Sequence, residues 1–148
     1  MFHEGITDEQ LIACYQQCDI FALPNREVNG DFEGFGMVLV EAQACGKAVI
    51  AGASGGTRET MDIGETGLIG NCSTPDFLAK AVPELLHDNA SLLAIGEAGR
   101  NWVLKHFDWT SLAEQAARIL GIEGNGQIGH PQPEPNRRAV DFEVGGNA

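Results

Sequence analysis

Two glutamates, eight residues apart, lie in the stretch of this 148-residue chain whose residue types are best suited to chemistry. Glu33 belongs to a short glycine-rich segment, and Glu41 belongs to the apolar segment that follows, for which we predict a helix from about Gly36 to Cys45. An ionised carboxylate only accepts hydrogen bonds, which suits it to the vicinal hydroxyl groups of a ribose or a hexose. The N–H groups at the start of such a helix favour phosphate or hydroxyl oxygens.

The surroundings of Glu41 leave two interpretations open. A helix that is apolar nearly all round is normally buried, so we expect Glu41 to lie where a carboxylate needs a partner. In the functional interpretation, the partner is a ligand and the glycines let the backbone approach it closely. In the other, Glu41 bonds a neighbouring backbone N–H or Arg58 and the glycines only form a turn. The spacing alone does not separate the two.

An ordered series of motifs resembles the retaining glycosyltransferases of family 4, which have the GT-B fold of two Rossmann-like halves facing each other across a cleft. Glu33 and Glu41 match the E-x7-E motif of that family. The resemblance covers about Phe2 to Leu120, as the later part of the C-terminal, donor-binding half. The motifs that carry it are Glu33-Gly-Phe-Gly36 with Glu41-Ala, Ala-Cys-Gly46-Lys-Ala-Val-Ile, Ser54-Gly-Gly-Thr-Arg-Glu59, Gly64-Glu-Thr-Gly-Leu68, Gly96-Glu-Ala-Gly-Arg100 and Phe107-Asp-Trp109.

The resemblance implies transfer of a sugar from a nucleotide-diphosphate donor to a hydroxyl acceptor, with retention of the anomeric configuration and without a metal or other cofactor. Glu41 would hold the ribose hydroxyls. Glu33, in the catalytic position, would contact the hexose hydroxyls near the reacting carbon, mainly to orient them. Backbone N–H groups would bind the sugar or the phosphate. The donor-binding residues that the resemblance implies are Gly34, Phe35, Gly36, Met37 and Glu41.

The remaining elements follow from local patterns. Thr7 and Gln10 have the spacing of a capping box, which predicts a helix to about Gln17. Thr74 is expected to cap a later helix, and Pro83 to kink or end it. Strands alternating with helices predict an α/β fold with a parallel sheet flanked by helices, a partial Rossmann-like three-layer unit. The expected strands are 19–23, 48–51 and 66–69, and the other expected helices are 57–61, 90–106 and 109–120.

Composition restricts the class of protein. A net charge of −12 argues against a nucleic-acid partner. No apolar run approaches the ~20 residues of a membrane span, and the N-terminus lacks the pattern of a signal peptide. The four cysteines form no secreted-domain pattern, so we expect a cytoplasmic protein. We predict one domain over residues 1–120 and a disordered tail over 121–148, which holds three of the six prolines.

Cations are scarce around the expected site. Residues 1–46 hold eight acids and one base, Arg26, with Lys47 and Arg58 nearby, whereas a diphosphate site normally needs cations. Three strands are expected where a doubly wound half-domain has about six. Both observations agree with what the resemblance implies, namely a longer enzyme whose N-terminal, acceptor-binding half, through which peripheral membrane contact is possible, is missing here. The alternative is a truncated, non-catalytic module that binds nucleotide or docks to a partner.

Overall fold

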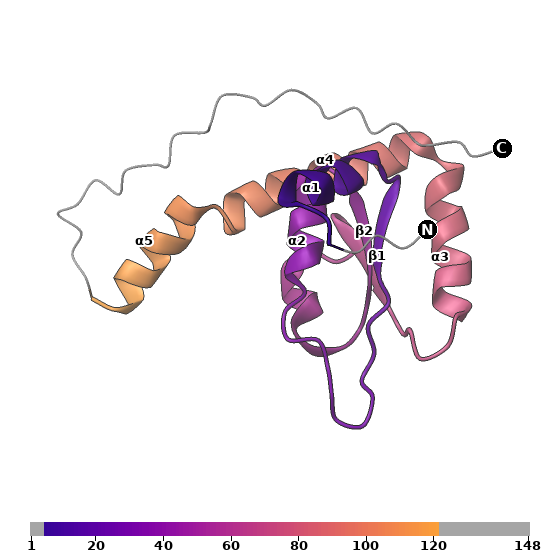
Figure 1. Cartoon of the computed structure of the whole chain (residues 1–148), viewed down its shortest axis with the longest axis horizontal. Helices are drawn as coiled ribbons and strands as arrows, with labels where there is room; N and C mark the ends of the chain where they lie inside the picture. Colours follow the sequence, from indigo (N-terminus) through magenta and orange to yellow (C-terminus); the bar gives the residue numbers. More distant parts are fainter. Residues whose placement is uncertain (1–4, 122–148) are drawn as a thin grey trace.

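The computed structural model describes residues 5–121. Three parallel strands form one sheet in the order β1-β2-β3, with helices on both faces (Figure 1). The elements in chain order are α1 (Asp8–Gln17), β1 (Ile20–Leu23), α2 (Met37–Ala44), β2 (Ala48–Gly52), the 3-10 helix η1 (Gly55–Thr60), β3 (Gly67–Gly70), α3 (Asp76–His87), α4 (Asn89–His106) and α5 (Trp109–Ile119). The expected α/β class with a parallel sheet is confirmed. The predicted tail over 121–148 lies, apart from Gly121, outside the described residues.

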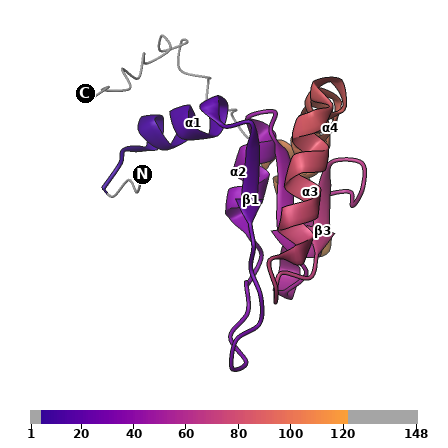
Figure 2. The same ribbon diagram turned by 90° about the vertical axis from the view of Figure 1, so that its right-hand side faces the viewer.

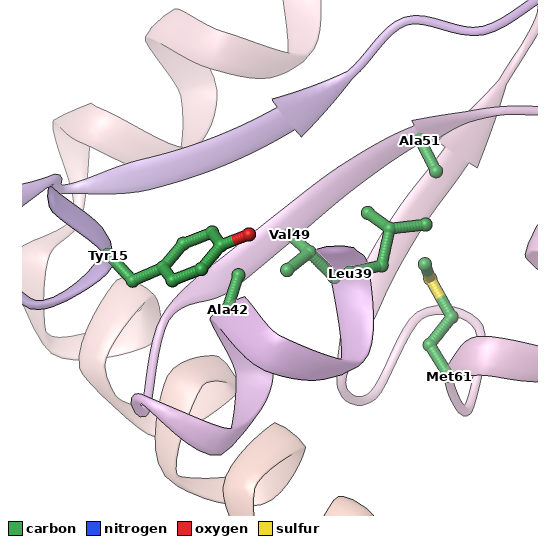
Figure 3. Packing of buried hydrophobic residues seen from close by; sticks show 6 residues of the cluster. All are labelled: Tyr15, Leu39, Ala42, Val49, Ala51 and Met61. Atoms are coloured by element: carbon green, nitrogen blue, oxygen red, sulfur yellow. The ribbon is translucent and has the colours of Figure 1, made fainter. Parts of the chain in front are cut away.

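The central strand β2 is covered on both faces of the sheet and contributes side chains to each. All five of its residues are buried, as expected for a parallel strand that is covered on both faces. Side chains from its alternate positions enter two separate apolar clusters. Val49 and Ala51 pack with Leu39 of α2 in the first cluster, which Figure 3 shows together with Tyr15 and Met61. The second cluster holds Ala48, Ile50, Ala81, Leu85 and Leu92, from β2, α3 and α4.

Local signals set several ends of the elements, and the predicted capping box at Thr7 is confirmed. The backbone N–H of Gln10 donates to Thr7 Oγ1 at 3.3 Å and the N–H of Thr7 donates to Gln10 Oε1 at 2.9 Å, which completes the capping box of α1. Gly46, with a φ of +74°, follows the end of α2 in the left-handed conformation that glycine favours. Asp88 caps α4, and its bonds from Ser91 lower the pKa of the Asp88 carboxyl.

Two predicted features of α3 are absent, an end at Pro83 and a cap at Thr74. The helix continues through Pro83 to His87. Pro83 lies on the exposed side, and the residue whose carbonyl loses its helical partner, Ala79, is exposed to water, while the opposite side is held by packing in the second cluster. Thr74 does not cap the helix, because its hydroxyl donates to the Asp76 carboxylate at 2.8 Å instead of accepting from a backbone N–H.

The last helix, α5, extends away from the layers around the sheet (Figure 1). None of its residues is buried, although the helix is capped by Asp108 as regularly as the others. Trp109 at its start is 79% exposed. Of the helices in residues 5–121, none combines the length and apolarity that crossing a membrane would require.

Candidate functional site

The predicted glycine-rich loop and helix meet at the carboxyl end of the sheet, where ligands of parallel α/β proteins bind. Gly36 directly precedes α2 and is buried with a φ of +85°, a conformation that an L side chain rarely adopts. Leu39, one turn later, donates its N–H to the carbonyl of Gly36 at 2.9 Å. No side chain caps α2 within the described residues, so its first N–H groups face the site without a side-chain partner.

Glu41 is exposed, so the expectation that it is buried together with the helix is wrong. Leu39, Ala42 and Gln43 face the sheet and the interior, which turns Glu41 to the open side of α2. Its partner is neither a neighbouring N–H nor Arg58. The hydroxyl of Tyr15 in α1 donates a hydrogen bond of 2.8 Å to Glu41 Oε2.

Tyr15 fixes the orientation of this carboxylate. Its side chain is 5% exposed, packs edge-to-face against Phe21 at 5.4 Å between ring centroids, and belongs to the first apolar cluster (Figure 3). Burial, and then the hydrogen bond to Glu41, raise the pKa of the Tyr15 hydroxyl, so it remains a hydrogen-bond donor at neutral pH. One oxygen of Glu41 is therefore held by the protein, and the other carboxylate oxygen can accept hydrogen bonds from a ligand.

Glu33 is half-buried at the start of the loop, and the second glycine-rich loop holds its backbone. The N–H of Gly56 donates to the carbonyls of Glu33 and Gly34 at 3.3 and 3.2 Å. A Cβ atom on Gly55 would collide with the carbonyl oxygen of Glu33. The loop of residues 54–56 thus packs against the Glu33 loop, and the N–H of Gly56 bonds that loop and not a ligand.

Phe35 anchors the same loop from another direction. Its ring lies edge-to-face against Phe107 at 5.7 Å, and Phe107 packs against Trp102 of α4 at 5.3 Å. The side chain of Phe35 is therefore a packing element. Its backbone N–H remains the group that the prediction assigns to the ligand.

Two motif residues on α4 hold α2 in place. A Cβ atom on Gly96 would meet the carbonyl of Gly46, so glycine lets α4 approach the end of α2 closely. Arg100 donates from Nη1 to the carbonyl of Ala44, one of the acceptors at that end. These contacts give a structural reason for the motif over residues 96–100.

Sequence reasoning missed two residues that organise the site. Tyr15, the one tyrosine of the chain, lies in the helix predicted to end at about Gln17, and nothing local indicates its partner 26 residues later. Asn25, directly after Pro24, joins the ends of two strands: its Oδ1 accepts from the N–H of Gly52 and its Nδ2 donates to the carbonyl of Ser54, both at 2.9 Å. An Asn next to a strand end was the only signal for that role.

The three cations considered for phosphate binding do not gather. Lys47 precedes β2 and so lies at the amino end of that strand, opposite the site. Arg26 follows β1 and Arg58 lies in η1, both at the carboxyl side and both exposed. Among residues 5–121, no group of three or more His, Cys, Asp and Glu side chains is arranged to hold a metal ion. Besides the backbone N–H groups, the cations on the carboxyl side of the sheet among these three are therefore Arg26 and Arg58.

Comparison with known proteins agrees with this architecture. The chain is 39% identical to a GDP-mannose-dependent alpha-(1-6)-phosphatidylinositol monomannoside mannosyltransferase of Mycolicibacterium smegmatis over 81% of this chain and 32% of that protein. It is 42% identical to a GDP-mannose-dependent monoacylated alpha-(1-6)-phosphatidylinositol monomannoside mannosyltransferase of Corynebacterium glutamicum over 78% of this chain and 30% of that protein. The chain thus spans about a third of the length of these relatives.

Solved structures share the fold. Sucrose-phosphate synthase from Thermosynechococcus elongatus superimposes with a TM-score of 0.71 at 33% identity, over 82% of this chain and 29% of that one. Anabaena HepE in complex with UDP-glucose gives a TM-score of 0.64 at 28% identity, over 78% and 30%. The family model described as glycosyl transferases group 1 matches residues 1–102. The chain therefore belongs to the glycosyl transferases group 1 family.

Proposed function

We propose that this chain is the donor-binding part of a retaining glycosyltransferase that moves a sugar from a nucleotide-diphosphate donor to a hydroxyl acceptor. The observation that carries the proposal is the junction of the Glu33 loop with the uncapped start of α2, beside the carboxylate of Glu41 that Tyr15 orients. The names of the relatives make GDP-mannose the first donor to test, and UDP-glucose, bound in HepE, the second. The products would belong to polysaccharide, lipopolysaccharide or glycolipid synthesis.

In the proposed mechanism, residues of this chain position the donor and stabilise charge rather than attack it. Glu41 accepts hydrogen bonds from the two ribose hydroxyls through the oxygen that Tyr15 leaves free. Glu33 orients the hexose hydroxyls beside the reacting carbon. The N–H groups of Phe35, Gly36 and Met37 donate to the sugar or to the departing phosphate, whose growing negative charge the positive end of α2 favours. Such positioning contributes to the rate without a nucleophile or a metal in this part of the protein.

The shortage of cations fits a diphosphate site that is completed outside residues 5–121. The rest of the phosphate site would then lie on further strands of the donor-binding half, and the acceptor site in an N-terminal half. The relatives, about two and a half times as long as this chain, have room for both. Location in the cytoplasm and peripheral contact with a membrane through that half stay predictions.

Substituting the two glutamates tests their separate roles in the natural gene product, whose mass an immunoblot establishes first. We expect Glu41→Gln to raise the KM for the donor by about 10- to 100-fold, the effect of weakening hydrogen bonds to a charged group. Glu33→Gln should instead lower kcat with a smaller change in the donor KM, because its contacts strengthen near the reacting carbon. Release of nucleoside diphosphate and the anomeric configuration of the product are measured.

Glu84→Gln, on the exposed side of α3, is the matched control and should leave both constants unchanged. An unchanged donor KM in Glu41→Gln would contradict the ribose assignment. A gene product no larger than 15.8 kDa that binds nucleotide without turnover would support the non-catalytic binding module instead.

Removing the Tyr15 hydroxyl tests whether orientation of Glu41 matters for binding. Tyr15→Phe keeps the ring and its packing, so we expect a loss of only about 1 kcal/mol in the free energy of unfolding. Affinity for GDP should fall about 10-fold, since Glu41 would then sample other orientations. Titration calorimetry on wild type, Tyr15→Phe, Glu41→Gln and the double variant gives the coupling: additive losses would show that Tyr15 does not act through Glu41.

A further inference from the structure

A cavity of about 430 Å³ opens at the carboxyl ends of all three strands, beside the Glu33 loop. Its size falls in the ~300–1,000 Å³ range of small-molecule sites. One wall is the connection between β1 and α2, which extends beyond the sheet (Figure 2). The side chains that matter for the inference are Arg26, Glu27, Phe32, Asn71 and Ser73.

The wall formed by this connection is an ordered hairpin. Val28 and Asp31 exchange two backbone hydrogen bonds of 3.0 Å, and the turn between them has positive φ at Asn29 (+55°) and Gly30 (+83°). Two positive φ values in an Asn-Gly pair are typical of the tight turn that joins antiparallel strands. The hairpin therefore holds Arg26 and Phe32 at defined places on the cavity wall.

The chemistry of the lining suits a neutral, hydroxyl-rich ligand. Phe32 is 61% exposed, and the electron-rich face of its ring favours the weakly positive C–H groups of a pyranose. Asn71 and Ser73 offer both donors and acceptors, as vicinal hydroxyls require. Arg26 and Glu27 contribute one positive and one negative charge, and no ion pair joins them within the part of the chain that the structure describes. A phosphate would need an excess of positive charge that this cavity lacks.

The cavity shares a wall with the predicted catalytic loop. Phe32 immediately precedes Glu33, and Gly55, which also lines the cavity, packs against the Glu33 carbonyl. A sugar bound here would therefore lie next to the donor hexose that Glu33 is proposed to orient. Reacting atoms must approach to about 3–3.5 Å for group transfer, so an acceptor needs a site in this neighbourhood.

We propose that this cavity binds a neutral carbohydrate unit of the acceptor, with Phe32 stacking on the sugar ring and Arg26 and Asn71 bonding its hydroxyls. The inference rests on the proposed function, because it assigns the acceptor side of the same reaction. It places an acceptor contact in the donor-binding half. A membrane-bound or soluble acceptor would be recognised there through the same sugar unit.

The test is binding of methyl hexosides, with methyl α-mannopyranoside first because two relatives are named for a monomannoside substrate. Saturation-transfer NMR on the 148-residue chain detects the weak affinity that one sugar ring provides. In wild type, we expect saturation to be transferred from the protein to the bound glycoside. In Phe32→Ala, we expect about 10-fold weaker binding, the effect of losing one stacking contact. Arg26→Gln should weaken binding as well.

Val28→Ala is the matched control, since Val28 is 48% exposed on the same hairpin and does not line the cavity. It should bind the glycoside as wild type does. Phe32 is exposed, so its variant should fold, and circular dichroism checks that it does. Binding that GDP-mannose displaces, binding unaffected by Phe32→Ala, or no binding of any hexoside in the panel would each overturn the inference. If no hexoside binds in this cavity but the donor still binds, the inference fails and the proposed function does not.

Discussion

Replacing Gly55 by alanine should destabilise the protein by at least about 3 kcal/mol. Roughly 1–2 kcal/mol of this loss is the cost of a positive φ in an L residue. The rest comes from overpacking. Gly55 has a φ of +61°, and a Cβ atom there would overlap the backbone carbonyl oxygen of Glu33. Backbone cannot move aside as a flexible side chain does, so either the Glu33 loop shifts or the second loop unfolds. Urea denaturation of wild type and variant measures the loss.

Gly64→Ala separates the two costs. Gly64 has a φ of +92° but open space around its Cα, so its variant has the conformational strain without the collision. We expect a loss of only about 1–2 kcal/mol for this control. Equal losses in both variants would show that the contact between Gly55 and Glu33 does not constrain the loop. If Gly55→Ala remains folded, its affinity for GDP should also fall, whereas that of Gly64→Ala should not.

The second large effect is expected at Gln43, the polar residue of α2 that is fully buried. Its Nε2 donates to the carbonyls of Leu39 and Thr60 at 3.1 and 2.7 Å, and Thr60 is itself fully buried. Gln43→Ala leaves a cavity and removes the partner of the Thr60 carbonyl. An unpaired buried carbonyl costs about 1–3 kcal/mol, and the whole loss should reach about 3–5 kcal/mol once the cavity is included. That is a large share of the ~5–15 kcal/mol that stabilises an ordinary domain.

Gln43→Leu separates the contribution of the cavity from that of the lost hydrogen bond, and Gln16→Ala is the exposed control. Leucine fills most of the volume but leaves the Thr60 carbonyl unpaired, and it also removes Gln43 Oε1, which has no hydrogen-bond partner within the described residues. Gln43→Leu should therefore lower the free energy of unfolding by less than Gln43→Ala does. Gln16 is exposed on α1, so its replacement by alanine should change the free energy of unfolding by less than about 0.5 kcal/mol. A Gln43→Ala variant as stable as Gln16→Ala would contradict the role of the buried amide.

The contrast between Gln43 and Glu41 shows how far the helix pattern could be read from the sequence. The apolar run predicted a buried helix correctly, and four of its eight residues are buried. It did not show which polar residue faces the interior, because a helix that is apolar nearly all round has no marked polar side. The rotation of α2 about its axis is set by its contacts with the sheet, α4 and η1 together, and these place Gln43 inside and Glu41 outside.

The sequence by itself determined what depends on few neighbouring residues: the capping box at Thr7, the turn at Asn29, the left-handed end at Gly46, the buried run of β2 and the passage from the Glu33 loop into α2. Each rests on local sterics, hydrogen bonds or a short period of apolar residues. Only the tertiary structure decided that Tyr15 orients Glu41 and that Gly55 supports Glu33. Those contacts join segments more than twenty residues apart, and their formation depends on how every helix packs on the sheet at once.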